Sequence, residues 1–153
     1  MLGLAAQWLG VNQTQANSVA PILISEEQGR HKSTFCRMLM PPQLARYYSD
    51  NLKLTAQGNP ERLLAEMGLL NMDEFDKFGA QKMPLLKNLM QMSSLNICKA
   101  YQKNFRSLPR IASFIGTSNR TDLLCDPTGS RRFICIEAEH DIDCTGIEHS
   151  QIY

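Results

Sequence analysis

The sequence predicts an α/β fold in which a mostly parallel central sheet is covered by helices. Four short apolar runs have the composition of buried strands, namely residues 22–24, 67–72, 111–117 and 132–136. Helical or polar segments separate these runs. Strands buried on both faces and joined through helices are typical of parallel sheets. The length of 153 residues fits a single domain.

Periodicity and breaker residues give the remaining elements. Apolar residues recur at helical spacing in several segments, and proline or glycine interrupts them. The helices expected from these patterns cover residues 4–16, 32–40, a short segment beginning at 59–61, and 82–92. Residues 96–110 alternate weakly around a polar turn and predict a β-hairpin. We expect residues 1–19 to form a helix and linker, and residues 20–153 to form the core.

The net charge of +1 hides a strong segregation of charge along the chain. Residues 1–76 contain 6 basic and 8 acidic residues, whereas residues 77–121 contain 8 basic residues and no acidic one. Residues 122–153 contain 2 basic and 7 acidic residues. A segment of this length without a carboxylate favours a polyanionic partner, with nucleic acid first. The alternative is a solvated basic face that the acidic tail balances after folding.

The sequence offers no membrane or secretion signal. Its apolar runs are shorter than the roughly 18 residues that a membrane helix needs, and no Lys or Arg precedes Arg30. The five cysteines form no C-x-x-C pair, which argues against a disulfide framework or a zinc ribbon. We therefore expect a cytoplasmic protein without a membrane partner.

The polar segment after the first strand has the context of a phosphate-binding loop, although an ordinary polar loop is the alternative. Backbone N–H groups of such a loop point at phosphates, and the following helix N-terminus adds positive charge. Lys32 would reach the terminal phosphates of ATP, and the Ser33 hydroxyl would bind Mg²⁺. The usual pattern has glycine where His31 stands, so only Gly29 relieves the turn. The expected nucleotide-binding residues are Gln28, Gly29, Arg30, His31, Lys32, Ser33 and Thr34.

Two carboxylates follow the second strand. A P-loop ATPase needs one acid to hold Mg²⁺, directly or through water, and another to orient or deprotonate the attacking water. Asp73 suits the metal role and Glu74 the catalytic role, while Asp76 is expected at a helix start or on the surface.

Further polar residues suit the remaining roles of an ATPase. Asn119 ends the third strand, where an amide can sense the terminal phosphate and hold water. Arg131 and Arg132 stand on a turn before the fourth strand, which suits an arginine finger acting on a neighbouring subunit. The alternative for this pair is salt bridging with the acidic tail.

Short motifs follow one another in a characteristic order over roughly residues 20–150. They are Gln28-Gly29-x-x-Lys32-Ser33-Thr34-Phe35, Asn71-Met72-Asp73-Glu74-Phe75-Asp76, Leu86-Lys87, Lys99-Ala100-Tyr101, Leu108-Pro109-Arg110, Phe114 to Asn119, and Asp126 to Phe133. In this order they resemble the virulence-associated protein E (VapE-like) family of phages and other mobile elements. The set is also similar to the cores of superfamily 3 helicases and AAA+ ATPases.

The resemblance implies a three-layer P-loop NTPase core, AAA+-like, with a basic β-hairpin before the sensor strand. It implies ATP and Mg²⁺ as cofactors, a role in replication similar to that of primase-helicases, and assembly into a ring, with a hexamer expected. Lys32 and Ser33 would match Walker A, and Asp73 and Glu74 would match Walker B. Asn119 would match sensor 1, and Arg131 or Arg132 would be the arginine finger. The core is expected to stop before a C-terminal lid.

In superfamily 3 helicases, a hairpin before sensor 1 contacts DNA in the central channel. Residues 99–106 fall at that place, within the stretch that lacks carboxylates. The expected contacts with single-stranded or forked DNA are Lys99, Tyr101, Lys103 and Arg106, with Tyr101 able to stack on bases.

Two other functions remain open at this point. The first is a DNA-binding module, gated by nucleotide or independent of it, in which His31 makes the loop degenerate and turnover is lost. The second is a small-molecule P-loop kinase, which would leave the basic stretch before Asn119 without a role.

Overall fold

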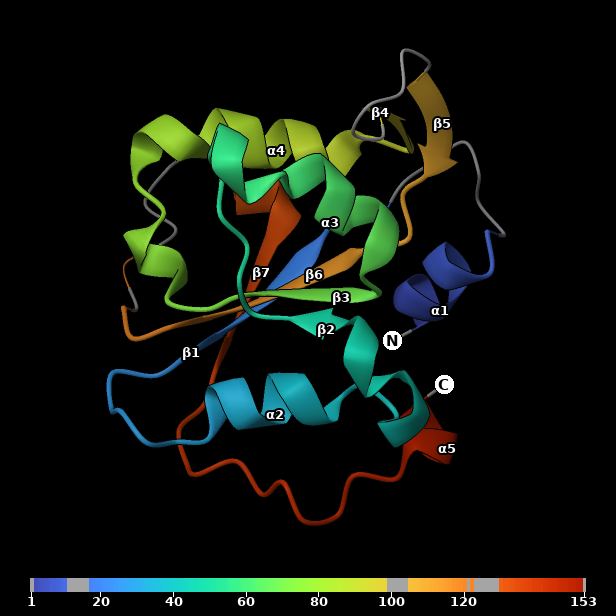
Figure 1. Ribbon diagram of the computed structural model, residues 1–153. Helices are drawn as coiled ribbons and strands as arrows, with labels where there is room; N and C mark the ends of the chain where they lie inside the picture. Colours follow the sequence, from blue (N-terminus) through green and yellow to red (C-terminus); the bar gives the residue numbers. More distant parts are fainter. Residues whose placement is uncertain (1, 11–16, 99–104, 121, 123–129, 153) are drawn as a thin grey trace.

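The computed structural model describes residues 2–10, 17–98, 105–120, 122 and 130–152. Its centre is a five-stranded sheet with the order β2-β3-β6-β1-β7, and all four pairings are parallel (Figure 1). The strands are β1 (Ala20–Ile24), β2 (Tyr48–Ser49), β3 (Leu69–Met72), β6 (Ser113–Ser118) and β7 (Phe133–Glu137). The expected α/β fold with a mostly parallel central sheet is therefore confirmed.

Helices lie on both sides of the sheet. Figure 1 shows α3 and α4 on one face, which we call the α3/α4 face, and α2 on the other, which we call the α2 face. The α-helices are α1 (Leu2–Trp8), α2 (Lys32–Met38), α3 (Pro60–Glu66), α4 (Met83–Gln91) and α5 (His149–Ile152). Short 3-10 turns cover Pro42–Tyr47, Ala56–Gly58, Phe75–Lys77, Ala80–Lys82 and Ser130–Arg132.

The alternation of side chains along each strand builds two hydrophobic cores. In β1, Ile22 and Ile24 pack toward the α3/α4 face, whereas Leu23 packs toward the α2 face. In β6, Phe114 and Ile115 divide in the same way. Because both faces are covered, these strands read as continuous apolar runs in the sequence.

The predicted hairpin is present as a separate two-stranded antiparallel sheet of β4 (Ser94–Cys98) and β5 (Phe105–Pro109). It stands off the main sheet and leads directly into the amino end of β6 (Figure 1). Within the described ranges, no helix is long and apolar enough to cross a membrane.

Several boundaries differ from the sequence-based expectation. The first helix ends at Trp8 rather than residue 16, because Gly10 takes a left-handed conformation (φ 65°) that stops the helix. The strand β2 has only two residues and offers no periodicity to detect. The terminal helix α5 has four residues and was likewise not predicted.

We expect Gly116→Ala to lower the free energy of unfolding by about 1–2 kcal/mol, because β6 is packed tightly at this position. A Cβ there would lie 2.6 Å from Ile22 Cδ1 and 3.3 Å from the Met72 carbonyl oxygen. Urea denaturation measures the change. Gly146→Ala is the matched control, since its Cβ would meet no atom within 4 Å. Equal stabilities for the two variants would contradict the packing argument.

Candidate functional site

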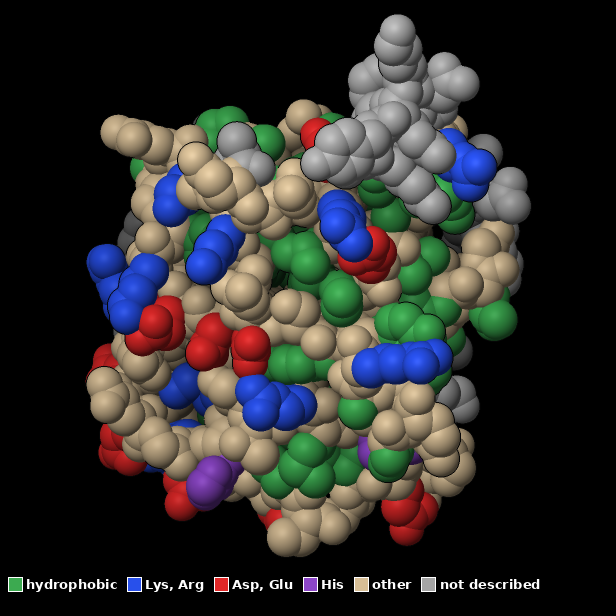
Figure 2. Space-filling view, viewed as in Figure 1, with side chains coloured by type: hydrophobic (Ala, Val, Ile, Leu, Met, Phe, Trp, Pro, Cys, Tyr) green, Lys and Arg blue, Asp and Glu red, His purple; other side chains and the backbone are tan. Residues whose placement is uncertain are grey.

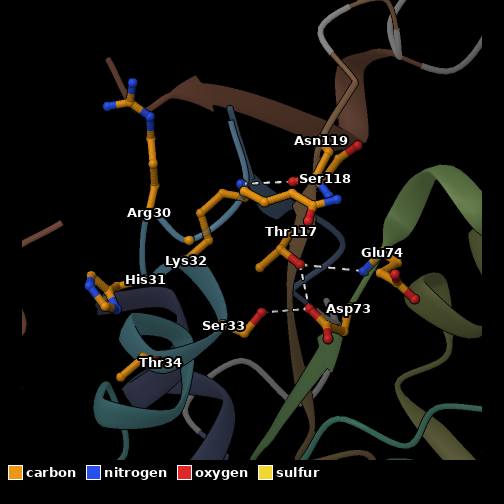
Figure 3. A pocket seen from close by; sticks show the side chains of 12 residues that line it. Arg30, His31, Lys32, Ser33, Thr34, Asp73, Glu74, Thr117, Ser118 and Asn119 are labelled. Carbon is orange, nitrogen blue, oxygen red and sulfur yellow. Dashed lines mark hydrogen bonds between the residues drawn. The ribbon is translucent and has the colours of Figure 1, made fainter. Parts of the chain in front are cut away.

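A pocket of about 380 Å³ opens at the carboxyl ends of the central strands (Figure 3). Its lining comes from the loop after β1, the first turn of α2, and the residues that follow β3 and β6. The lining residues are Gln28, Gly29, Arg30, His31, Lys32, Ser33, Thr34, Asp73, Glu74, Thr117, Ser118 and Asn119. Ligand sites in open α/β sheets form at this edge, and the volume suits a small molecule. The structure thus brings together all seven residues expected to bind nucleotide, the two acids and Asn119.

The loop after β1 takes left-handed backbone conformations at two positions. Gly29 has φ 85°, and His31 has φ 57° and ψ 19°. The sequence left only Gly29 to relieve the turn, whereas His31 takes the left-handed conformation as well. Histidine reaches this region at a steric cost, and such strained residues cluster at functional sites.

Backbone donors gather along this loop. Among the described residues, the N–H groups of Gly29 and of residues 31–34 donate to no protein acceptor. The first N–H groups of a helix have no partner within the helix, and α2 begins at Lys32. All these residues line the pocket, so an anion in it would find several donors close together.

Lys32 joins the loop to the end of β6. Its ammonium group donates to Asn119 Oδ1 at 2.9 Å and to the carbonyl oxygens of Glu27 and Ser25 at 3.3 and 3.4 Å. The side chain is only 8% exposed. Burial lowers the pKa of Lys32, nearby Arg30 lowers it further, and Asp73 opposes both. Lys32 lines the pocket, so an anion there would meet a buried cation as well as the loop N–H groups.

A compact group of oxygens faces Lys32 across the pocket. Ser33 Oγ donates to Asp73 Oδ1 at 2.7 Å, and Thr117 Oγ1 donates to the same oxygen at 2.5 Å (Figure 3). Thr117 Oγ1 also accepts the N–H of Glu74 at 3.3 Å. These bonds connect α2, β3 and β6 through their side chains.

Glu74 follows Asp73 in a left-handed conformation with φ 51°. Its carboxylate forms a 2.6 Å ion pair with Lys77 and points away from Lys32 (Figure 3). The Glu74 side chain is 53% exposed, so this ion pair is weak and can exchange with solvent. In Figure 2, acidic side chains lie next to Lys and Arg side chains on the side of the molecule where β1 and β3 end.

The guanidinium of Arg30 points out of the pocket. It forms a 2.7 Å ion pair with Glu27 and donates to the carbonyl oxygen of Glu139 at 2.5 Å. The N–H of Ile142 donates to the Arg30 carbonyl oxygen at 3.4 Å. Arg30 therefore ties the loop to the segment after β7.

The two arginines predicted to act as a finger lie elsewhere. Arg131 and Arg132 end a 3-10 turn at the amino end of β7, where Phe133 pairs with Ala20 of β1. The amino ends of the strands lie opposite the carboxyl ends, where the pocket opens. Neither arginine therefore reaches the pocket of its own chain. Among the described side chains, neither arginine forms an ion pair with the acidic tail.

Of the four residues predicted to contact DNA, the structure describes only Arg106. Arg106 is exposed on β5 of the hairpin. Lys99, Tyr101 and Lys103 lie outside the described residues.

Two hydroxyl groups of the site have no role in the sequence-based prediction. Thr117 contacts both acids, as described above, and Ser118 Oγ donates to Asp76 Oδ1 at 2.9 Å. Asp76 lies in the first turn of the 3-10 helix Phe75–Lys77, as expected for a helix start, and its carboxylate in addition anchors the end of β6. The signal in the sequence was a pair of hydroxyl residues directly before Asn119, at the end of an apolar strand.

The family model described as the virulence-associated protein E-like domain matches residues 10–153. The chain belongs to this family, which confirms the resemblance. The sequence matches none of the curated proteins with which it was compared.

Among solved structures, the fold is similar to the apo structure of the NrS-1 C-terminal region (305–718), with a TM-score of 0.62 and 22% identity. An A-form apo structure of the same region gives a TM-score of 0.59, also at 22% identity. Each match covers 99% of this chain, but only 38% and 36% of the respective structure. The chain thus spans less than two fifths of either structure.

We expect His31→Gly to raise the free energy of unfolding by about 0.5–1 kcal/mol. Glycine removes the left-handed penalty of about 1–2 kcal/mol, and its greater freedom in the unfolded chain offsets part of that gain. Urea denaturation measures the difference. His140→Gly is the control, because His140 is exposed and has no positive φ. A loss of stability in His31→Gly would show that the imidazole makes a compensating contact.

Proposed function

We propose that this chain is the ATP-binding and ATP-hydrolysing core of a phage or mobile-element replication protein, which couples ATP to DNA binding or unwinding as an oligomer. The observation that carries the proposal is the pocket, where unpartnered loop N–H groups, a buried lysine and two acids meet at the carboxyl edge of a parallel sheet. Membership of the VapE-like family supports the replication role. The similar NrS-1 structures are much longer, so the activity of the whole protein is part of the proposal.

The oxygens in the pocket fit a magnesium ion. Neighbouring ligands of an octahedral Mg²⁺ lie about 2.9 Å apart, given metal–oxygen distances of about 2.0–2.1 Å. Ser33 Oγ and Asp73 Oδ1 are 2.7 Å apart. Because the Ser33 hydrogen points at Asp73, the lone pairs of Ser33 Oγ stay available to a metal. Ser33 would hold the ion, and Asp73 would hold it directly or through water. A magnesium ion there would neutralise charge on the phosphates.

Each remaining residue has a role that follows from its place. The loop N–H groups and Lys32 would bind the phosphates, and the Asn119 amide beside Lys32 would orient the attacking water. Glu74 would accept the proton of that water once its carboxylate leaves Lys77 and turns toward the pocket. The exposed ion pair is weak enough for this movement.

The position of the arginine pair supports action on a second copy of the chain. Arg131 and Arg132 lie at the amino ends of the strands, away from the pocket of their own chain. They could therefore complete only the pocket of a neighbouring copy. Head-to-tail contacts of this kind form a ring when the rotation from one copy to the next closes on itself. We propose a hexamer on the strength of the family resemblance.

The hairpin supports DNA as the partner. Arg106 is exposed on β5, and the surrounding segment from 77 to 121 carries no carboxylate. Lys99, Tyr101 and Lys103 stay proposed contacts with single-stranded or forked DNA, through phosphate pairing and base stacking.

A nucleotide-gated DNA-binding module without turnover is the second candidate function. The ion pair between Glu74 and Lys77 favours it, because it holds the proposed base out of the pocket. In this function the phosphates would still bind at the loop.

We expect Lys32→Ala to weaken ATP binding by at least about 10-fold, because a charge-assisted bond to phosphate is lost. Titration of the chain with a fluorescent ATP analogue, with and without Mg²⁺, measures the affinity. Lys53→Ala is the matched control, since Lys53 is exposed and does not line the pocket. Equal ATP affinity of wild type and Lys32→Ala would contradict the proposal that this loop binds the phosphates.

We expect Glu74→Gln to lower the rate of ATP hydrolysis by about 10²-fold or more while ATP affinity is kept, since the amide cannot accept the proton. Phosphate release in the presence of single-stranded DNA measures turnover, and Glu61→Gln on α3 is the surface control. Should the wild type hydrolyse ATP no faster than Glu74→Gln, the binding module without turnover takes the place of the ATPase.

A further inference from the structure

The Thr117 hydroxyl forms hydrogen bonds to both acidic residues of the pocket, to the side chain of Asp73 and to the backbone of Glu74. Thr117 lies at the end of β6, is 3% exposed, and follows Gly116, which pairs with Met72 of β3. Its hydroxyl donates to Asp73 Oδ1 at 2.5 Å and accepts the Glu74 N–H at 3.3 Å. One buried hydroxyl thus donates a hydrogen bond to one residue and accepts a hydrogen bond from the next, and both residues follow β3.

The two bonds fix different properties of the acids. The bond to Asp73 restricts the rotation of its carboxylate, and Ser33 Oγ donates to the same oxygen at 2.7 Å. Both bonds therefore hold Asp73 Oδ1, the oxygen that lies beside Ser33 Oγ where the metal is proposed. The bond to the Glu74 N–H holds a backbone that has φ 51° and ψ 52°. This conformation is unfavourable for a residue with a side chain, so it persists only where its surroundings enforce it.

We propose that Thr117 is a positioning residue, which aims Asp73 at magnesium and sets the backbone from which Glu74 approaches the pocket. This inference rests on the proposed ATPase function and deepens it. It adds a residue that acts through two others, the acid that would hold the metal and the acid that would accept the proton of the attacking water. Loss of its hydroxyl would uncouple Mg²⁺ from ATP binding and slow turnover, while the loop and Lys32 would still bind the phosphates.

The test compares Thr117→Val, which keeps the shape of the side chain and removes the hydroxyl, with Thr117→Ser, which keeps the hydroxyl. ATP affinity is measured with and without Mg²⁺, followed by kcat and KM for hydrolysis. We expect Thr117→Val to reduce the gain in affinity that Mg²⁺ provides by about 10-fold and to lower kcat more than it raises KM. Thr117→Ser should restore most of both. Ser113→Ala removes another buried hydroxyl from β6, far from the pocket, and is the matched control.

A second readout needs no nucleotide. Hydrogen exchange followed by NMR reports the Glu74 amide, which should exchange at least 10-fold faster in Thr117→Val than in wild type or Thr117→Ser. The Ser25 amide, which donates to the Ser118 carbonyl oxygen at 3.2 Å, is the internal reference for general loosening of this edge. Equal acceleration of both amides would mean that the hydroxyl only stabilises the fold, and would overturn the proposal.

The outcomes separate this inference from the function on which it rests. If the wild type binds ATP with Mg²⁺, and Thr117→Val matches it in Mg²⁺ dependence and kcat, the role of Thr117 is overturned alone. If the wild type binds no ATP, the proposed function fails, and the role of Thr117 fails with it. Loss of binding in Thr117→Val both with and without Mg²⁺ would also overturn positioning, since a general defect of the pocket would then explain it.

Discussion

The parallel pairing of β6 with both β1 and β3 is the constraint on which the rest of the structure depends. This central position brings Asn119 beside Lys32 of the loop after β1, and Thr117 beside Asp73 at the end of β3. The pairing holds because β6 is buried along its length, with Gly116 leaving room for Ile22. Because all three strands run in the same direction, their polar ends share one edge, and the pocket forms there.

The pocket concentrates conformations and charges that would be unfavourable elsewhere in the chain. His31 and Glu74 both have left-handed backbones, and Lys32 is buried among oxygen atoms. The two hydrophobic cores above and below the sheet hold these groups in place, since β1, β3 and β6 each contribute side chains to both. Strain and buried charge gathered at one edge are expected of a binding site and are costly for a loop that only connects a strand to a helix.

The fold also separates two groups of residues, one at the carboxyl ends of the parallel strands and one at their amino ends. The carboxyl edge of the sheet carries the pocket, while the amino edge carries the arginine pair and receives the hairpin. The VapE-like family and the NrS-1 C-terminal region share this chain's fold, and the NrS-1 structures extend well beyond its length.

The sequence by itself determined the α/β class, the central strands, the hairpin and all members of the pocket except Thr117 and Ser118. Continuous apolar runs and polar residues at strand ends are local features, and parallel topology converts them into a shared edge. Only the tertiary structure decided that His31 could adopt the left-handed backbone conformation typical of glycine. It also decided that the Arg30 guanidinium binds the segment after β7. The same holds for Thr117, whose partners are more than 40 residues away along the chain. Such contacts depend on which strands are neighbours, and strand order leaves no trace in local periodicity.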